Sequence, residues 1–500
     1  MTISLPSFHS GEPVALASVP CLPVRQFRAE IISAVHAGST LTALFGAPAE
    51  NSEIHLFGVL ADSISSSLSA LSAKVNEAYP SLTVECTQAH WFEREIAEQW
   101  NIEPQGHPWL KPIRFHPPYR LSGAARTPLS GATEFFRLDG DEVHEVAVGP
   151  VHAGVIEPGH FRFQCHGERV LHLEISLGYQ HRGVEAALAG GPNKRAIHLI
   201  ETLSGDSSIG HATAYCEAVE GLSGTAVPPR ALVLRGIALE LERIANHTGD
   251  LGALAGDVGY LPTAAYCGRI RGDFLNLTAA ICGSRFGRGM LRPGGVLSDV
   301  DANLAGELSR RLDKALKDVE DATRLMWDAP SVQARFEDTG AINAATCKAL
   351  GLVGPAARAS GVERDVRQDA PSGIFRFAQI PISKWNTGDV FARAWVRWLE
   401  IQRSAVFVRE QLASLPQGPT RIAVSPMAPA YLVVSLTEGW RGEIAHVAIT
   451  DDSGRFARYK VIDPSFRNWM GLAIAMRDQQ ISDFPLCNKS FNLSYCGHDL

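Results

Sequence analysis

The sequence contains no pair of cysteines at the C-x-x-C spacing, although it has 9 cysteines in 500 residues. Thiolate pairs at that spacing are the usual way in which a chain holds zinc, nickel or an iron-sulfur cluster. Widely separated cysteines in a long chain without a secretion signal also favour reduced thiols over disulfides. The missing pairs therefore argue against a metal centre held by thiolates.

Long apolar runs and basic blocks are lacking as well. No stretch approaches the roughly 20 apolar residues that span a bilayer, and the first residues, MTISLPSFHSGEP, have neither the cationic start nor the apolar core of a signal peptide. A formal net charge of -7 gives no electrostatic footprint for nucleic acid. We therefore expect no transmembrane segment and no nucleic-acid partner, so that any membrane association comes through other subunits.

The chain does contain enough apolar material for more than one core, with 45% hydrophobic residues. Residues 1–120 mix short apolar runs with a helix-like stretch at residues 65–78, and they predict a small α+β domain. Residues 121–144 are rich in Gly, Pro, Ser and Thr and predict a linker. Residues 145–500 are then expected to form a second, larger domain.

Period-two alternation of apolar residues predicts β-hairpins at both ends of the second domain. Residues 161–165 and 171–175 alternate on either side of a short turn. The same pattern returns at residues 444–449 and 456–462, around a turn at residues 452–454.

Between the hairpins, apolar residues at helical spacing predict three long helices. One helix starts behind the two prolines at residues 228–229, and a second carries a leucine stripe at residues 304–319. The third starts at an Asp389 cap and is expected to direct Val390, Trp395, Leu399 and Val406 inward. The predicted fold is therefore α+β, with a large and mainly helical second domain flanked by β-hairpins.

A series of short motifs along the second domain occurs in a recognisable order. The motifs are GPVH at 149–152, EPGHFR at 157–162, GYQHRGVE at 178–185, ERIANH at 242–247, RFGRG at 285–289, RPGGV at 292–296, RGE at 441–443 and DPSF at 463–466. Together they resemble the 49-kDa subunit of complex I and the large subunits of nickel-iron hydrogenases.

The first segment carries a second resemblance, through ERE at 93–95 and GHP at 106–108. These motifs are similar to the 30-kDa subunit of complex I (NADH:ubiquinone oxidoreductase). The fused order of the two segments is typical of the large subunits of formate hydrogenlyase and hydrogenase-4 complexes, which belong to the group 4 nickel-iron hydrogenases. The resemblance implies a 30-kDa-like domain followed by a hydrogenase large-subunit fold.

In the hydrogenases that this chain resembles, two C-x-x-C pairs hold the nickel and iron. Alignment on HATAY at 211–215 places the first pair at Ser204 and Ser207, and the tail places the second at Ser494 and Gly497. Serine hydroxyls do not ionise near neutral pH and are hard oxygen ligands, so they hold a soft metal poorly. We therefore expect no nickel-iron centre and no metal ligands at these positions.

Two other ligand sets remain open at this stage. Cys487, Cys496 and His498 lie near the C-terminus and could form a different metal site, although three mixed ligands there are more often incidental. The complex I subunit has also lost the metal and binds a quinone in the vacated cavity through a tyrosine and a histidine. Here the tyrosine position falls on Gly205, and the histidine position on His160 or His152. A quinone is thus a candidate ligand, with both positions departing from the complex I pattern.

Several residues have a functional and a structural interpretation. Glu157 matches a glutamate that relays protons in hydrogenases, but it also fits a structural ion pair. Arg441 matches an arginine beside the iron ligands, and an ion pair with Glu443 or another acid would explain it equally well. The polar group that lines the cavity if the resemblance holds, Ser204, Asp206 and Ser207, could instead cap a helix. His152 and His160 could donate to a headgroup or pack in the core.

The leading hypothesis is a catalytic-core subunit of a membrane-anchored, proton-translocating oxidoreductase. Electrons would come from an iron-sulfur cluster in a small subunit of the complex I 20-kDa type and pass to a quinone or another acceptor. Membrane-embedded ion-translocating subunits would be further partners, with this chain peripheral on the cytoplasmic side. The alternatives are a redox-silent coupling subunit and an active hydrogenase with unusual ligands. Because the chain has no GxGxxG signal, any NADH would bind elsewhere.

Overall fold

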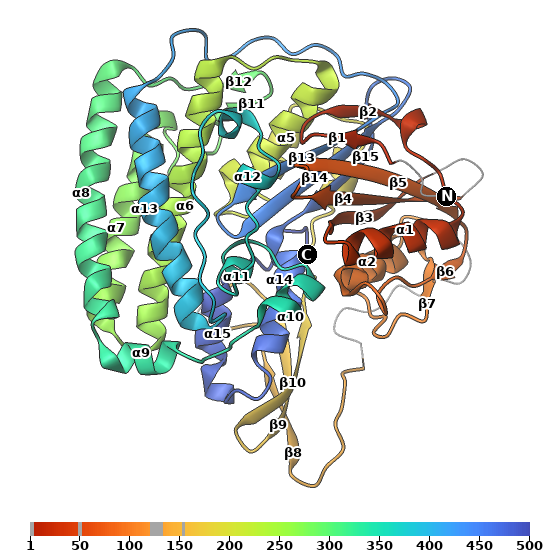
Figure 1. The fold of residues 1–500 in the computed structure, drawn as a ribbon, viewed down its shortest axis with the longest axis horizontal. Coiled ribbons are helices and arrows are strands. Elements are labelled where there is room, and N and C mark those ends of the chain that lie inside the picture. The colour runs from red at the N-terminus through yellow and green to blue at the C-terminus, as the bar shows by residue number, and fades with distance from the viewer. Residues whose placement is uncertain (1–4, 49–52, 121–133, 153–155) are drawn as a thin grey trace.

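The first layer of the molecule is a four-stranded antiparallel sheet built by the N-terminal segment (Figure 1). The computed structural model describes residues 5–48, 53–120, 134–152 and 156–500. The sheet has the order β1-β5-β4-β3. Its strands are β1 Ser7–Phe8, β3 Thr40–Pro48, β4 Ile54–Asp62 and β5 Ser67–Val75, and the helices α1 Val24–His36 and α2 His90–Trp100 pack against them.

The prediction of a helix at residues 65–78 was wrong, because β5 occupies most of this stretch. Leu68, Leu71 and Val75 have helical spacing, but all three are buried in a strand that lies between β1 and β4. The strand pairs with β4 from Ser67 to Val75, so its backbone forms hydrogen bonds to β4 along its whole length and not within a helix. Tertiary pairing has overridden a local preference here.

A second four-stranded sheet, of order β15-β14-β13-β2, lies at the centre of the molecule (Figure 1). The strands β13 Tyr431–Gly439, β14 Gly442–Thr450 and β15 Phe456–Ile462 form an antiparallel meander, and they confirm the predicted hairpin at residues 444–462. The fourth strand, β2 Pro13–Ala15, comes from the start of the chain and pairs with β13. The N-terminal segment thus completes the sheet of the C-terminal one.

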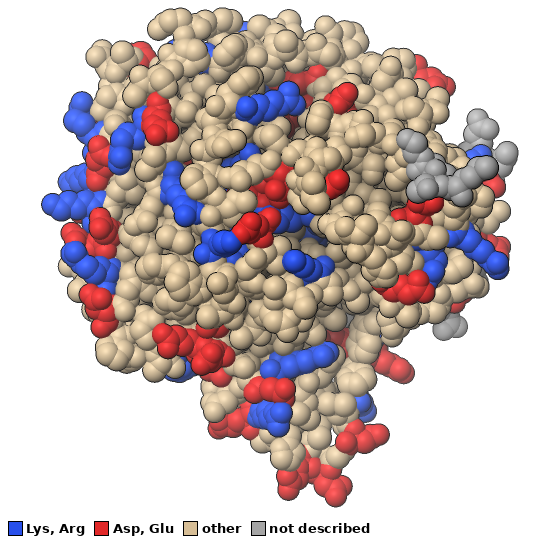
Figure 2. Space-filling model, viewed as in Figure 1, with Lys and Arg blue, Asp and Glu red and all other residues tan. Residues whose placement is uncertain are grey.

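The other predicted hairpin is confirmed and forms part of a protruding three-stranded sheet (Figure 1). Strands β8 Val143–Val148, β9 His160–His166 and β10 Arg169–Ser176 lie in the order β10-β9-β8. Asp and Glu side chains gather at the far end of this sheet, whereas charges of both signs are interspersed over the rest of the visible face (Figure 2).

The third layer consists of long helices, and all three predicted helices are confirmed. They are α6 Pro229–Asp257, α8 Ala302–Trp327 and α13 Val390–Ala413, and α7 Leu261–Cys282 packs between α6 and α8. Asp389 caps α13 as predicted, since its carboxylate accepts a hydrogen bond of 2.8 Å from the Ala392 N–H. Among the described residues, no helix is long and apolar enough to cross a bilayer.

One detail of α13 was wrong: Val406 points outward and its side chain is 48% exposed. At about 100° per residue, Trp395, Leu399 and Val406 share one face of the helix, nearly opposite Val390. Val390 is fully buried, so the set predicted to point inward cannot all do so.

Shorter elements connect these layers and carry most of the motifs. They are β6 Ala78–Pro80, β7 Glu103–Gln105, α3 Val184–Leu188, α4 Ala196–Glu201, α5 Ser208–Ser223, β11 Leu291–Arg292, β12 Gly295–Val296, α9 Pro330–Phe336, α10 Ala344–Leu350, α11 Gly354–Arg358, α12 Val366–Asp369, α14 Pro464–Ala475 and α15 Phe484–Phe491. The predicted α+β fold, strand-rich first and mainly helical later, is confirmed.

A buried cluster of charges joins the N-terminal segment to the rest of the chain. The Lys460 ammonium on β15 lies 2.7 Å from the Glu95 carboxylate on α2 and 2.8 Å from the Glu185 carboxylate on α3. Arg114 pairs with Glu95 at 2.6 Å. Buried charges need such partners, because removing one leaves the other desolvated and unpaired. The domain limits at 120 and 144 stay a prediction, since most of the expected linker, residues 121–133, lies outside the described residues.

Candidate functional site

The segment that aligns with the first lost ligand pair forms the connection between α4 and α5. Ser204 and Ser207 are buried, whereas Gly205 is exposed. Ser207 is the N-cap residue of α5, but its side chain makes no capping hydrogen bond. The N–H groups of Ile209 and Gly210 at this helix end donate instead to Glu242 on α6, at 2.7 and 3.2 Å. The capping interpretation of the serines is therefore wrong.

Arg441 brings this connection together with the tight turn between β13 and β14. Its guanidinium donates to both carboxylate oxygens of Asp206, at 2.6 and 2.8 Å, and to the hydroxyls of Ser204 and Ser207, at 3.3 and 3.2 Å. Its Nε donates to the Asn492 carbonyl at 2.5 Å. The four predicted site residues Ser204, Asp206, Ser207 and Arg441 thus form one polar cluster, which we call the Arg441 cluster.

The expected pairing of Arg441 with Glu443 was wrong, although the alternative of another acid holds. Glu443 pairs instead with Arg364 and, at 3.1 Å, with Arg467. Alternation along a strand would place residues 441 and 443 on one face, but Arg441 lies in the turn before β14 begins, so the alternation does not apply to it. Proximity in the sequence was therefore a poor guide to the partner.

Two acids at this site, Asp206 of the Arg441 cluster and Glu242 beside the start of α5, differ in their electrostatics. Burial raises the pKa of Asp206, but the Arg441 guanidinium and the neighbouring hydrogen bonds outweigh it, so the pKa lies below its usual value. Within the described residues the Glu242 carboxyl forms no ion pair, and burial raises its pKa to about 8 against the effect of the two N–H donors. Near neutral pH the site therefore combines an ionised Asp206 with a Glu242 that holds a proton.

The tail brings the second pair of positions to the same region. The Ser494 N–H donates to the Ser465 hydroxyl at 2.8 Å, and Ser465 follows Asp463 in the DPSF motif. At Gly497, a Cβ atom would lie 2.5 Å from the carboxylate carbon of Asp463. A larger side chain, such as the cysteine expected there in a hydrogenase, would clash with Asp463 as it now lies.

Asp463 begins a chain of buried hydrogen bonds that runs into the central sheet. Its carboxylate lies 3.0 Å from His211 Nε2, His211 Nδ1 lies 3.1 Å from His446 Nε2, and His446 Nδ1 lies 2.8 Å from the Tyr459 hydroxyl. All four side chains are buried. Burial works to raise the pKa of Asp463, but His211 and Arg441 bring it to about 2.

Glu157 lies against the tail and not against Arg441. Its carboxylate accepts hydrogen bonds from the Cys496 thiol, at 2.9 Å, and from the Tyr495 N–H, at 3.1 Å. His152 and His160 bond within their own loop in the described part of the chain, to the Gly159 and Gly149 carbonyls at 3.0 and 3.2 Å. The structure thus joins Glu157 to the tail, and it leaves both histidines apart from the Arg441 cluster.

The residues present do not fit a nickel-iron centre. The guanidinium of Arg441 binds both hydroxyls of the first pair, and Asp463 fills the space beside Gly497. Over the described ranges, no group of three or more His, Cys, Asp or Glu side chains is arranged to hold a metal ion. The alternative set is also dispersed: Cys496 binds Glu157, and His498 lies 3.1 Å from both Lys460 and Glu95.

Sequence reasoning missed the roles of Asp463, His211, His446, Tyr459 and Glu242. Asp463 and Glu242 lie inside motifs that had already been recognised, and His211 belongs to the segment used for the alignment. The motifs therefore marked these three residues, but they did not show which role each one has. His446 and Tyr459 had been interpreted only as strand residues, and polar side chains buried in a sheet are the signal that would have marked them.

The fold, the order of the two segments in one chain and the polar site between α5 and the tail together define a class of protein. This class is the large subunits related to complex I and to the nickel-iron hydrogenases. The family model of the 49-kDa subunit of respiratory-chain NADH dehydrogenase matches residues 257–430, and that of the 30-kDa subunit matches residues 29–130. The chain belongs to this family. The recognition of a fused 30-kDa and 49-kDa subunit is therefore confirmed.

Curated relatives place the chain among both branches of the family. It is 33% identical to the carbon monoxide-induced hydrogenase of Rhodospirillum rubrum, over 70% of this chain and 97% of that protein. It is 28% identical to formate hydrogenlyase subunit 5 of Escherichia coli, over 83% and 76%. It is 30% identical to NADH-quinone oxidoreductase subunit 4 of Thermus thermophilus, over 68% and 90%. The predicted class, an oxidoreductase subunit, is thereby confirmed.

Proposed function

We propose that this chain is the large subunit of a membrane-associated, complex-I-like oxidoreductase without a nickel-iron centre. In this proposal it passes electrons from an iron-sulfur cluster in a small partner subunit to a quinone or another small acceptor, and ion translocation in membrane-embedded partners is coupled to that step. The relatives support the class of complex, because they include components of hydrogenases and of NADH-quinone oxidoreductases.

The observation that carries the acceptor role is the Arg441 cluster. A guanidinium and two hydroxyls converge at one point, and these groups can donate hydrogen bonds to a quinone oxygen. The cluster reaches the surface, since Gly205 is exposed and the Asp206 side chain is 30% exposed. A small subunit that docks over Gly205 would bring its iron-sulfur cluster close to the Arg441 guanidinium.

Protons can be held next to the same cluster. Quinone reduction consumes protons as well as electrons, and the Glu242 carboxyl, whose pKa is raised to about 8, holds a proton near neutral pH. The buried chain from Asp463 to Tyr459 begins close to Arg441, whose guanidinium helps to lower the pKa of Asp463. In the proposed function Glu242 supplies a proton and Arg441 orients the acceptor.

A second candidate is a redox-silent subunit that couples conformational changes to the membrane partners. It is favoured by the saturation of Arg441, whose Nε, Nη1 and Nη2 atoms all donate within the protein. An acceptor would have to displace Asp206 or the serines to reach the guanidinium. The serines and Asp206 would then serve to hold the turn between β13 and β14 against α5.

Both candidates imply a chain without a nickel-iron centre, and the metal content of the complex tests this. We would purify the complex with its small subunit and measure nickel and iron per large subunit by plasma mass spectrometry. The expected result is iron without stoichiometric nickel. A stoichiometric nickel signal would overturn the proposal, because the metal would then need ligands other than thiolates.

Gly205 separates the two candidates. A Cβ atom at Gly205 would meet only the end of the Arg288 side chain, at 3.6 Å, so we expect the fold to accept Gly205→Trp and the indole to obstruct access to the Arg441 cluster. Quinone reduction by the complex should fall at least about tenfold. Gly268→Trp, at an exposed glycine where an added Cβ atom would meet nothing within 4 Å, is the matched control. Unchanged quinone reduction in Gly205→Trp would favour the redox-silent role.

A further inference from the structure

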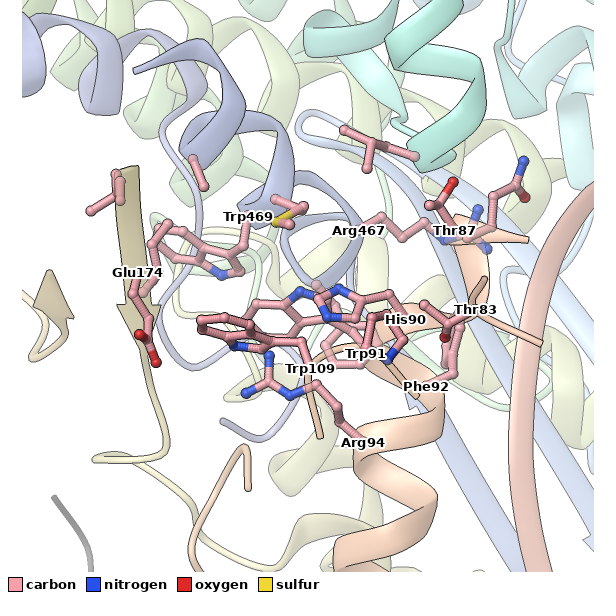
Figure 3. A pocket seen from close by; sticks show the side chains of 18 of the residues that line it. Thr83, Thr87, His90, Trp91, Phe92, Arg94, Trp109, Glu174, Arg467 and Trp469 are labelled. Atoms are coloured by element: carbon pink, nitrogen blue, oxygen red, sulfur yellow. The ribbon is translucent and has the colours of Figure 1, made fainter. Parts of the chain in front are cut away.

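A cavity of about 390 Å³ lies on the side of α14 that faces α2 and the strand β10. Figure 3 shows that Trp91 and Arg94 reach it from α2, Glu174 from β10, and Trp469 from α14. Three parts of the chain that are far apart in the sequence therefore build its walls. Its volume falls in the range of pockets that hold small molecules, about 300–1,000 Å³.

The walls of this cavity are mainly aromatic. They include Trp91, Trp109, Phe136, Phe466 and Trp469, with Met470 and Ala473 beside them. Aromatic faces bind flat rings and acyl chains over a large contact area. An apolar body that entered the cavity would therefore lose its hydration against several ring faces.

The charged groups at this cavity are predominantly cationic. Its lining contains Arg94, Arg467 and Arg477, against one acid, Glu174, which lies 2.7 Å from the Lys111 ammonium. Arg94 donates to the Lys111 and Pro112 carbonyls, and within the described residues it forms no ion pair with a carboxylate. Its positive charge is compensated by these backbone dipoles and, beyond ion-pair distance, by the Glu98 and Glu174 carboxylates.

Arg467 and Arg477 are also incompletely compensated. Arg467 pairs with Glu443 at 3.1 Å, but its Nε and Nη1 atoms have no hydrogen-bond partner in the part of the chain that the structure describes. Arg477 is exposed at the rim, and no carboxylate of the described ranges pairs with it. Burial lowers the pKa of Arg94 and of Arg467 to about 10, as expected for cations that lack full partners.

We propose that this cavity is a binding site for a small organic anion, with an apolar ring or acyl chain between the aromatic walls and its acidic group toward the arginines. The site is separate from the Arg441 cluster and does not depend on the proposed electron transfer. Neutral apolar molecules of the same size would leave the arginines uncompensated, so the acidic group determines selectivity. A carboxylate or a sulfonate would serve, because both present oxygens to a guanidinium.

Two probes distinguish an aromatic from an acyl ligand. The complex that contains the full chain would be titrated with 1-anilinonaphthalene-8-sulfonate, followed by fluorescence, and the bound probe would then be displaced with decanoate or with 1-naphthoate. We expect one probe per chain in this site. Displacement by decanoate at the lower concentration would assign an acyl anion, and displacement by 1-naphthoate an aromatic one. Decanol, which lacks the charge, should displace the probe at least about tenfold less effectively than decanoate.

Two variants tie the binding to this cavity. Arg477→Glu reverses a charge at the exposed rim, and it should weaken probe binding about tenfold. Ala473→Phe fills the cavity from α14 and should abolish binding even if the charge contributes little. Arg310→Glu, at an exposed arginine of α8 without an ion pair among the described residues, is the control and should bind as the unmodified chain does.

Three results would overturn the proposal. Equal binding in Arg477→Glu, in Ala473→Phe and in the unmodified complex would place the probe elsewhere. Equal displacement by decanol and decanoate would show that the arginines do not select an anion. Absence of probe binding in the intact complex would mean that a partner's side chains fill the cavity.

Discussion

Arg441 and Asp206, which are 235 residues apart in the sequence, form a two-point ion pair in which the guanidinium donates at 2.6 and 2.8 Å. The pair lies where related hydrogenases are expected to have their first two thiolates, and Ser204 and Ser207 bind the same guanidinium. A cation and an anion thus occupy a place that a soft metal would need for itself. Four residues, Ser204, Asp206, Ser207 and Arg441, contribute to this ion pair and its hydrogen bonds. Exclusion of a metal therefore does not rest on a single missing cysteine.

The strength of this pair can be measured with a double-mutant cycle of Asp206→Asn and Arg441→Gln. A fully buried pair can lose about 3–5 kcal/mol when one partner is removed, but the Asp206 side chain is 30% exposed, so we expect a coupling energy of about 2 kcal/mol. The exposed pair Arg324–Asp321 is the control and should give about 0.5 kcal/mol. Chemical denaturation of the full chain measures both. A coupling no larger than that of the control would show that the pair does not stabilise the site.

Local periodicity and ordered motifs were sufficient to predict the long helices α6, α8 and α13, both hairpins and the family, whereas the long helix α7 was not predicted. These features depend on residues close in the sequence, whose spacing of 2 or 3.6 is visible in any window. The same reasoning failed at β5, because its leucines fit a helix and only the pairing with β4 makes it a strand. It also failed at Val406, which lies nearly opposite the buried Val390 on α13.

The candidate site was predicted only in its parts. Ser204, Asp206, Ser207 and Arg441 were all named, but nothing local could show that Arg441 prefers Asp206 to Glu443. The clash between a side chain at Gly497 and Asp463 also arises from contacts between segments that the sequence does not order in space. Partners across a fold depend on packing, and a single sequence contains no direct record of it.

Glu242 should make the stability of the chain depend on pH. Its pKa is about 8 in the folded state and near 4.5 when unfolded, so between these values the folded state holds a proton that the unfolded state has lost. Stability therefore falls as pH rises through this window, by as much as about 5 kcal/mol at pH 8. In Glu242→Gln the fall should be smaller, and thermal unfolding at pH 5 and pH 8 measures the difference.

The comparison isolates Glu242 because other raised carboxyls are common to both proteins. Burial raises the pKa of Glu217 and of Glu438 to about 7, and these groups contribute equally to each pH profile. Glu307→Gln, at an exposed glutamate of α8, controls for the loss of one charge. Parallel profiles of the unmodified chain and Glu242→Gln would contradict a protonated Glu242.

The hydrogen bond between Tyr459 and His446 should contribute measurably to stability. Tyr459→Phe removes the hydroxyl 2.8 Å from His446 Nδ1 and leaves a buried ring nitrogen without a partner. An unsatisfied buried polar group costs about 1–3 kcal/mol, so we expect a loss of about 2 kcal/mol in urea denaturation. Tyr431→Phe is the matched control, because Tyr431 lies on β13 and is only partly buried. Equal losses in the two variants would show that the hydrogen bond to His446 contributes nothing beyond the loss of an ordinary tyrosine hydroxyl.

Glu157 should control the reactivity of Cys496 at the tail. Burial and the adjacent Glu157 carboxylate raise the pKa of the Cys496 thiol to about 12, so little thiolate is available for alkylation. Glu157→Ala removes the negative charge and the acceptor of the Tyr495 N–H, and it should speed labelling of Cys496 by iodoacetamide at pH 8 about tenfold. Mass spectrometry of labelled peptides gives the rate for each thiol. Cys21 is exposed and should react at the same rate in both proteins. A second control is Glu168→Ala, at an exposed glutamate of the turn between β9 and β10, which should leave the labelling rate of Cys496 low. If Cys496 reacts equally slowly without Glu157, burial alone protects it, and Glu157 does not hold the tail in place.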